Sequence, residues 1–257
     1  MNRIDSMFAE LKKQNKKALI TFITAGDPDF DTTEQLANLI ELGVPFSDPI
    51  AEGPIIQEAS LRSLQGGTTL EGIFELVKKL RTKTEIPLVF MMYINTIYRF
   101  GVERFFSLCQ ETGIDAVIVP DLPFEEHDEI DECAYAHGVY PINLVAPTSK
   151  DRIAAIAANS KGFLYCVSST GVTGVRNIFQ TDFDSFFDTI KQHASIPYCV
   201  GFGISSPEQV KQMKTYCDGV IVGSAIVKMI GQEQKSSVAT VGTFVKSLRN
   251  ALDDISK

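Results

Sequence analysis

The stretch LIELGVPFSDPIAEGP, residues 39–54, carries the strongest signal for the fold. Its apolar first part, residues 39–44, predicts a buried strand, and that strand contains one carboxylate, Glu41. A loop rich in proline and glycine follows, and it carries Asp48 and Glu52. An acid inside a buried strand is costly unless it is paired or used. Because α/β barrels keep their chemistry in the loops directly after the strands, this stretch predicts an active site on such a barrel.

Similar apolar runs recur along the chain and alternate with helical patterns. Several runs are apolar almost throughout, which is typical of parallel strands covered on both faces. Strands are expected at residues 18–24, 39–44, 87–93, 115–121, 140–146, 163–168, 197–203 and 218–224. Helices are expected at residues 69–81, 102–112, 125–137, 150–159, 182–193, 206–216 and 234–255, after an amphipathic N-terminal helix within residues 1–17. Eight alternations predict the α/β class and a closed (β/α)8 TIM barrel, with a doubly wound open sheet as the alternative.

The length of the chain fits one domain. At 257 residues it matches a single barrel of ~250 residues, so residues 1–257 are expected to form one domain. One connection is short, because only about fourteen residues separate the first two strands. A crossover needs a dozen or more residues, and we therefore expect a shortened first helix of about two turns there.

Composition excludes several classes of partner and site. A net charge of −8 argues against nucleic acid or an anionic membrane as the main partner, and no apolar run approaches the ~20 residues of a membrane span. The five cysteines are widely spaced and lie mostly in apolar runs, which indicates reduced thiols in a cytoplasmic protein. The three histidines show no ligand spacing with the cysteines or with each other, so no metal site is expected.

Polar residues and glycines collect at the predicted strand ends, where a barrel holds its active site. Glycine-rich turns follow the last three strands, at residues 170–174, 201–205 and 223–224, and they favour phosphate binding over plain turn chemistry. Glu41 is either a buried acid satisfied by a neighbouring donor or a general acid/base whose pKa is raised by burial. Glu52 and Asp48 lie in a loop, where a solvated acid is equally compatible. No predicted strand ends in a lysine, which weakens the case for a Schiff-base aldolase.

The residues quoted above resemble the tryptophan synthase α subunit family. The resemblance rests on ELGVPFSDP at residues 41–49 with Gly53 and Pro54, and on TAGDP at residues 24–28. It also rests on GVTG at residues 171–174, GFGIS at residues 201–205 and GSAIV at residues 223–227. These motifs occur in the order expected for the family, and the first of them is very specific.

The resemblance implies a carbon–carbon lyase that cleaves indole-3-glycerol phosphate to indole and glyceraldehyde 3-phosphate in tryptophan biosynthesis. Glu41 matches the general acid/base, and Glu52 matches the second catalytic carboxylate, which accepts the indole N–H. Residues that match the phosphate-binding turns are Gly174, Gly203, Gly223 and Ser224, and those that match the indole pocket are Phe22, Tyr93, Tyr165 and Phe202. Thr173 is expected to pack against the Glu52 loop when the loops at residues 45–54 and 171–181 close.

The resemblance also implies a partner, a pyridoxal-phosphate-dependent β subunit in an α2β2 hetero-tetramer, with no cofactor in this chain. Two features depart from the family: Glu52 stands where aspartate is usual, and the first crossover is short. These departures leave open a degenerate α-like chain that only binds and activates a β subunit. Another phosphate-sugar isomerase or aldolase on the same barrel is the other alternative.

Overall fold

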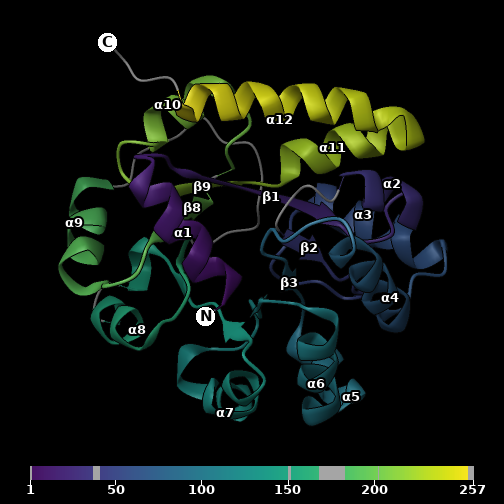
Figure 1. The fold of residues 1–257 in the computed structure, drawn as a ribbon, viewed down its shortest axis with the longest axis horizontal. Helices are drawn as coiled ribbons and strands as arrows, with labels where there is room; N and C mark the ends of the chain where they lie inside the picture. The colour runs from purple at the N-terminus through teal and green to yellow at the C-terminus, as the bar shows by residue number, and fades with distance from the viewer. Residues whose placement is uncertain (1, 37–40, 150–151, 168–182, 202, 254–257) are drawn as a thin grey trace.

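A ring of parallel strands surrounded by helices forms the molecule (Figure 1). The computed structural model describes residues 2–36, 41–149, 152–167, 183–201 and 203–253. The strands are β1 (Ala18–Thr24), β2 (Glu41–Gly43), β3 (Val89–Met91), β4 (Ala116–Ile118), β5 (Tyr140–Pro141), β6 (Leu144–Val145), β7 (Leu164–Val167), β8 (Tyr198–Gly201) and β9 (Gly219–Val222). The helices are α1 (Arg3–Lys13), α2 (Phe30–Leu36), α3 (Pro54–Gln65), α4 (Leu70–Arg81), α5 (Ile94–Phe100), α6 (Val102–Thr112), α7 (Asp128–Ala136), α8 (Ile153–Asn159), α9 (Phe183–His193), α10 (Pro207–Met213), α11 (Ser224–Glu233) and α12 (Ser237–Asp253). Short 3-10 turns are η1 (Phe124–Glu126), η2 (Pro147–Ser149) and η3 (Gln234–Ser236).

The sheet closes on itself. Its strand order is β5-β4-β3-β2-β1-β9-β8-β7-β6, so the first strand pairs with both the second and the last. The two ends of this order, β5 and β6, are halves of one predicted strand at residues 140–146. They are joined by Ile142, whose N–H donates to Val117, and Asn143, whose carbonyl accepts from Tyr165. This strand therefore completes a barrel, which confirms the TIM fold and excludes the open doubly wound sheet.

Two layers of apolar side chains stabilise the barrel. The larger layer lies between the strands and the outer helices, where the strand residues Leu42, Phe90 and Val117 are buried. The smaller layer fills the barrel interior and includes Ile20 and Ile221. Alternate residues of a strand point to opposite faces, so a strand buried on both faces must be apolar at successive positions.

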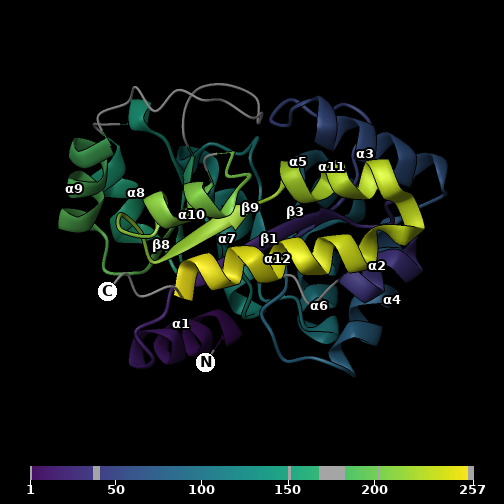
Figure 2. The ribbon, with the colours of Figure 1, turned by 90° about the horizontal axis from the view of Figure 1, so that it is seen from above.

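Helix α1 closes one end of the barrel, as expected for the extra N-terminal helix. Ile4 and Phe8 on its apolar face pack into the interior layer. Asn2 caps the helix by accepting from the N–H of Ile4, and its amide donates to the carbonyls of Asp115 and Gly138. Figure 2 shows α1 at one end of the barrel and α3 at the other. The end that carries α3 is the end where the strands finish and the site lies.

The first crossover is short, as the sequence predicts. It contains α2, a helix of 7 residues, followed by residues 37–40, which lie outside the described part. Other differences from the sequence-based prediction are additions. Helices α3 and α5 follow β2 and β3 where we expected only loops. Pro54 lies in the first turn of α3, and Tyr93 is the N-cap of α5. The residues before both helix starts are typical of loops, so the sequence did not predict these helices.

None of the helices in the described residues combines the length and the hydropathy that a membrane span requires.

Candidate active site

Glu41 lies inside the barrel. It is the first residue of β2, and the strand register places it between Phe22 of β1 and Val89 of β3. Directly paired residues of parallel strands point to the same face of the sheet, and Val89 belongs to the interior layer. The side chain of Glu41 therefore points into the barrel, where it is 1% exposed.

The surroundings of Glu41 favour its protonated form. Neither carboxylate oxygen has a hydrogen-bond partner among the residues that the structure describes. Because burial disfavours the charged form, the pKa of Glu41 is raised to about 8. Burial, and secondarily the nearby Glu41, also raise the pKa of the Tyr165 hydroxyl well above its usual range. The sequence left open whether a donor satisfies Glu41, and the described residues supply none.

A cavity of about 70 Å³ brings the two predicted catalytic acids together. Glu41 and Glu52 both line it, although one lies in a strand and the other in the loop before α3. The remaining lining residues are mostly apolar or glycine: Phe22, Ile56, Met91, Tyr165, Gly201, Gly203, Ile204, Ile221, Gly223 and Ser224. A mostly apolar lining that includes two carboxylates suits an aromatic ring that carries polar groups.

Tyr93 fixes the position of Glu52. Its hydroxyl donates to the Glu52 carboxylate and accepts the backbone N–H groups of Ile50 and Ala51, both at 2.8 Å. Its ring stacks on Phe46 with the centroids 4.7 Å apart. Tyr93 therefore contacts the start of the loop at Phe46, its middle at Ile50 and Ala51, and the carboxylate of Glu52.

Burial and hydrogen bonding oppose each other at Glu52. Burial raises its pKa, the hydrogen bond from Tyr93 lowers it, and the net shift is upward. The negative charge of Asp121 adds to the upward shift. The carboxylate is thus held by a donor on one side and open to the cavity on the other, which is the arrangement a hydrogen bond to a substrate N–H requires.

Glycines make room for the aromatic rings of the cavity. A Cβ on Gly43 would lie 2.4 Å from the ring of Phe22, and a Cβ on Gly201 would lie 2.7 Å from the hydroxyl of Tyr165. Both rings can enter the barrel only because these strand positions lack side chains. The glycines of β2 and β8 therefore shape the cavity as well as the turns that follow the strands.

One end of the cavity suits an anion. Ser224 begins α11 at the cavity wall, and Gly223 is its N-cap. The first N–H groups of a helix have no partner within the helix and carry the positive end of its dipole. Gly203 lies opposite in the lining with a φ of +64°, a left-handed conformation that favours glycine. Such an end is a suitable site for a phosphate group.

The structure gathers most of the predicted site residues. Glu41, Glu52, Phe22, Tyr165, Gly203, Gly223 and Ser224 all line the cavity. Tyr93 is absent from the lining of this cavity, and its contact with the site runs through Glu52. Thr173, Gly174, Phe202 and the predicted closing loop at residues 171–181 lie outside the described residues.

Sequence reasoning missed several lining residues. Met91 and Ile221 were assigned only to strands, and Ile56 was not assigned to any element. The strand residues could have been found, because Met91 pairs with Gly43, two positions after Glu41, and so faces the same side. Ile56 could not, because its place in the cavity depends on how α3 packs over the end of the barrel.

Comparisons with known proteins point to one family. A family profile described as tryptophan synthase alpha chain matches residues 8–253. The tryptophan synthase alpha chain of Thermoanaerobacter sp. (strain X514) is 47% identical over 262 residues, which cover 98% of this chain and 100% of the relative.

Solved structures have the same fold. The crystal structure of tryptophan synthase alpha chain from Legionella pneumophila superposes with a TM-score of 0.87 at 33% identity, covering 100% of this chain and 99% of the other. A chain from the tryptophan synthase α2β2 complex of Pyrococcus furiosus superposes with a TM-score of 0.84 at 38% identity, covering 91% of this chain and 98% of the other.

Proposed function

The chain belongs to the tryptophan synthase alpha chain family and cleaves indole-3-glycerol phosphate in tryptophan biosynthesis, and we propose that Glu41 and Glu52 carry out this cleavage. The observation that carries the proposal is the cavity that holds both acids in different electrostatic surroundings. Two carboxylates with different environments can take different roles in one reaction.

Glu41 is the general acid/base. Cleavage requires a proton at the indole carbon that leaves the glycerol chain, and it requires loss of a proton from the neighbouring hydroxyl. With a pKa of about 8, Glu41 is protonated at neutral pH and can donate the first proton. The resulting carboxylate then accepts the hydroxyl proton as the carbon–carbon bond breaks, so that Glu41 ends the cycle protonated.

Glu52 stabilises the protonated ring. Once the ring carbon has taken up a proton, positive charge spreads to the indole nitrogen, and a carboxylate beside its N–H stabilises that charge. Glu52 carries one methylene more than the aspartate usual in the family, and Tyr93 holds this longer side chain together with its loop.

The remaining site residues bind the substrate. Phe22 and Tyr165 line the space for the indole ring, and Phe202 is proposed beside them from the sequence motif. The phosphate end is formed by Gly203, Gly223 and Ser224. Gly174 is proposed beside them from the sequence motif. Thr173 is proposed to pack against the Glu52 loop when substrate binds.

We infer the wider setting from the same family membership. The chain pairs with a β subunit, as in the α2β2 complex of Pyrococcus furiosus, and receives no cofactor itself, since pyridoxal phosphate belongs to the β subunit. Residues 1–257 are proposed to form one domain, because every described strand belongs to one sheet. The reduced cysteines support a cytoplasmic location.

Indole release by the variant Glu41→Gln tests the proposal. Glutamine keeps the size of the side chain and cannot donate or accept the proton, so turnover should fall by about 10²–10⁴-fold, with and without β subunit. Glu75→Gln, an exposed substitution on α4 with the same loss of charge, is the control and should keep wild-type turnover. Wild-type turnover by Glu41→Gln would refute the role of Glu41.

The same assay separates the two alternatives. If the chain is degenerate, the wild-type protein would activate the β subunit but release no indole. A phosphate-sugar isomerase or aldolase would act on pentose phosphates and leave indole-3-glycerol phosphate intact.

A further inference from the structure

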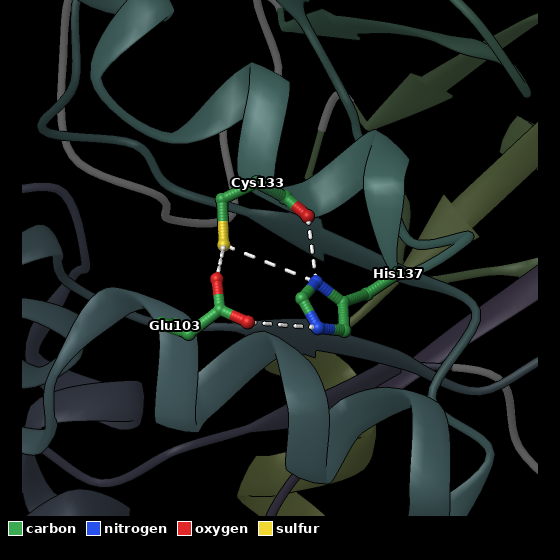
Figure 3. Close-up of side chains that lie close together, drawn as sticks. All are labelled: Glu103, Cys133 and His137. Carbon is green, nitrogen blue, oxygen red and sulfur yellow. Dashed lines mark hydrogen bonds and ion pairs between the residues drawn. The ribbon is translucent and has the colours of Figure 1, made fainter.

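Three potential metal ligands meet on the outside of the barrel, between α6 and α7 (Figure 3). Glu103 lies in the first turn of α6, Cys133 lies in α7, and His137 is the C-cap of α7. One donor atom from each lies within 4.8 Å of the other two. Carboxylate, thiolate and imidazole are the three protein groups that bind zinc.

Two contacts of Glu103 have lengths close to the ligand–ligand spacing of a zinc site. Sγ of Cys133 lies 3.3 Å from Oε2 of Glu103, and Nε2 of His137 lies 3.3 Å from Oε1 of the same carboxylate. Ligand bonds of 2.0–2.3 Å at tetrahedral angles place donor atoms about 3.4–3.6 Å apart. The two contacts reach different oxygens of the Glu103 carboxylate, so this exposed side chain would turn to bring one oxygen to a zinc ion shared with Cys133 and His137.

The histidine is oriented as a ligand. Its Nδ1 lies 2.9 Å from the carbonyl oxygen of Cys133, which is only an acceptor, so Nδ1 carries the hydrogen. In the neutral ring the lone pair is then on Nε2, the nitrogen that faces Glu103. Either a proton or a metal ion on Nε2 holds this nitrogen next to the carboxylate. Metal-binding histidines usually donate their other ring N–H to an acceptor such as a backbone carbonyl, which fixes the orientation of the ring.

We propose that Glu103, Cys133 and His137 form a zinc site that joins α6 to α7, with a water molecule as the fourth ligand. The thiol sulfur selects zinc over magnesium or calcium, which prefer oxygen ligands only. The sequence predicted no metal site, and the proposal departs from that prediction because Cys133 and His137 are four residues apart and adjacent turns of a helix bring such residues together.

Binding exchanges a proton for the metal. In the metal-free protein the Cys133 thiol donates a hydrogen bond to the Glu103 carboxylate. When zinc binds, the sulfur coordinates as thiolate and the proton leaves to solvent. The negative charge of Glu132, which also acts on Cys133, favours the cation.

Cys133 is the one cysteine suited to this role. The other four, Cys109, Cys166, Cys199 and Cys217, are buried, whereas Cys133 is partly exposed. The site also lies in the outer helices, and its three residues are absent from the lining of the cavity that holds Glu41. Zinc should therefore change stability and thiol reactivity without changing indole release.

Cobalt and zinc titration of the chelator-treated full-length protein tests the proposal. One equivalent of Co²⁺ should give the charge-transfer absorption of a cobalt–thiolate bond, and Zn²⁺ should remove it by displacement. Cys133→Ser should abolish the absorption, and Glu103→Gln and His137→Gln should each weaken zinc binding by about tenfold or more. Glu111→Gln on α6 and His193→Gln on α9, both exposed, are the matched controls and should bind as wild type.

Two measurements on the wild-type chain remain informative if a variant folds poorly. Zinc should raise the melting temperature, and it should protect Cys133 from alkylation by iodoacetamide. A cobalt spectrum without the thiolate band, unprotected Cys133 at saturating zinc, or unchanged zinc affinity in Cys133→Ser would each overturn the proposal.

Discussion

At the residue scale, Glu41 and Glu52 lie eleven positions apart in the sequence and differ in what surrounds them. Glu41 is 1% exposed and has no hydrogen-bond partner among the described residues, whereas Glu52 accepts a hydrogen bond from Tyr93 and faces the cavity. Burial therefore keeps a proton on Glu41, while Tyr93 favours the charged form of Glu52. Two glutamates therefore have different surroundings, as the different roles proposed for them require.

The burial of Glu41 should make stability depend on pH. Its pKa rises from the ordinary 4.5 to about 8 on folding, so between these pH values the folded state holds a proton that the unfolded state has lost. The contribution to the free energy of unfolding is fully present below pH 4.5 and is lost as pH rises to about 8, by up to about 5 kcal/mol at 1.36 kcal/mol per unit. Urea denaturation of wild type and Glu41→Gln measures it.

The stability of the variant relative to the wild type should increase as pH rises. Glutamine cannot ionise, so the free energy of unfolding of Glu41→Gln should rise progressively relative to that of the wild type between pH 5 and pH 8. A stability difference that stays constant over this range would show that Glu41 does not titrate there.

Removing the Tyr93 hydroxyl should impair catalysis more than folding. Tyr93→Phe keeps the stacking on Phe46 but loses the bonds to Glu52, Ile50 and Ala51. Because a displacement of ~1 Å can cost about a hundredfold in rate, kcat for indole release should fall by about 10–100-fold with little change in the circular dichroism spectrum. Tyr98→Phe, an exposed tyrosine on α5, is the control. Unchanged kcat in Tyr93→Phe would mean that the loop holds Glu52 without it.

At the element scale, a hollow lies beside the last helix. Beside α2 and α12 lies a hollow of about 590 Å³, lined by apolar residues of both helices and of β1. The lining includes Leu19, Leu36, Val241 and Val245. Side chains that line a hollow lack contact partners on that side, so α12 can accept an added side chain there.

Gly242 offers a test of whether the hollow beside α12 is open. It lies within α12 and lines the hollow, and a Cβ built on it meets nothing within 4 Å. Gly242→Ala should raise the free energy of unfolding by about 1 kcal/mol, because alanine favours the helix, and should raise the melting temperature by about 2–4 °C.

The matched control is Gly231→Ala in α11. A Cβ there would lie 3.0 Å from the guanidinium of Arg62, so the same gain in helix propensity is offset by a clash. Calorimetry of both variants measures the difference. If Gly242→Ala is no more stable than the wild type, the hollow is not open at that position.

At the scale of the whole molecule, the loop that carries Glu52 also presents apolar surface. Ile50 is 75% exposed and Leu61 of α3 is 56% exposed. A surface hollow of about 550 Å³ runs beside them, lined by Phe46, Pro49 and Leu64 among others. Large exposed apolar side chains around a hollow are typical of a protein interface, and this one adjoins the acid that completes the site.

Leu61→Asp should weaken association with the β subunit by about tenfold or more, because it places a charge in an apolar contact. Indole release by the isolated chain should stay at the wild-type rate, because Leu61 is absent from the lining of the catalytic cavity. Titration calorimetry with purified β subunit measures the affinity, and Ala239→Asp, exposed on α12, is the control for added charge. Equal affinity in both variants would place the interface elsewhere.

Local chemistry in the sequence determined the barrel and its principal acid. Continuous apolar runs such as AVIV at residues 116–119 require burial on both faces, and repeated alternation with helical patterns leaves few folds other than a closed parallel barrel. The cost of burying an acid inside such a run is enough to single out Glu41 from the sequence alone.

Only the tertiary structure decided how distant segments meet. The bond from Tyr93 to Glu52 joins residues 41 positions apart, and Ile56 reaches the cavity because α3 packs over the barrel end. The cluster of Glu103 with Cys133 and His137 joins residues about thirty positions apart. Periodicity fixes which face of its own element a side chain occupies, but the packing of separate elements fixes which faces meet.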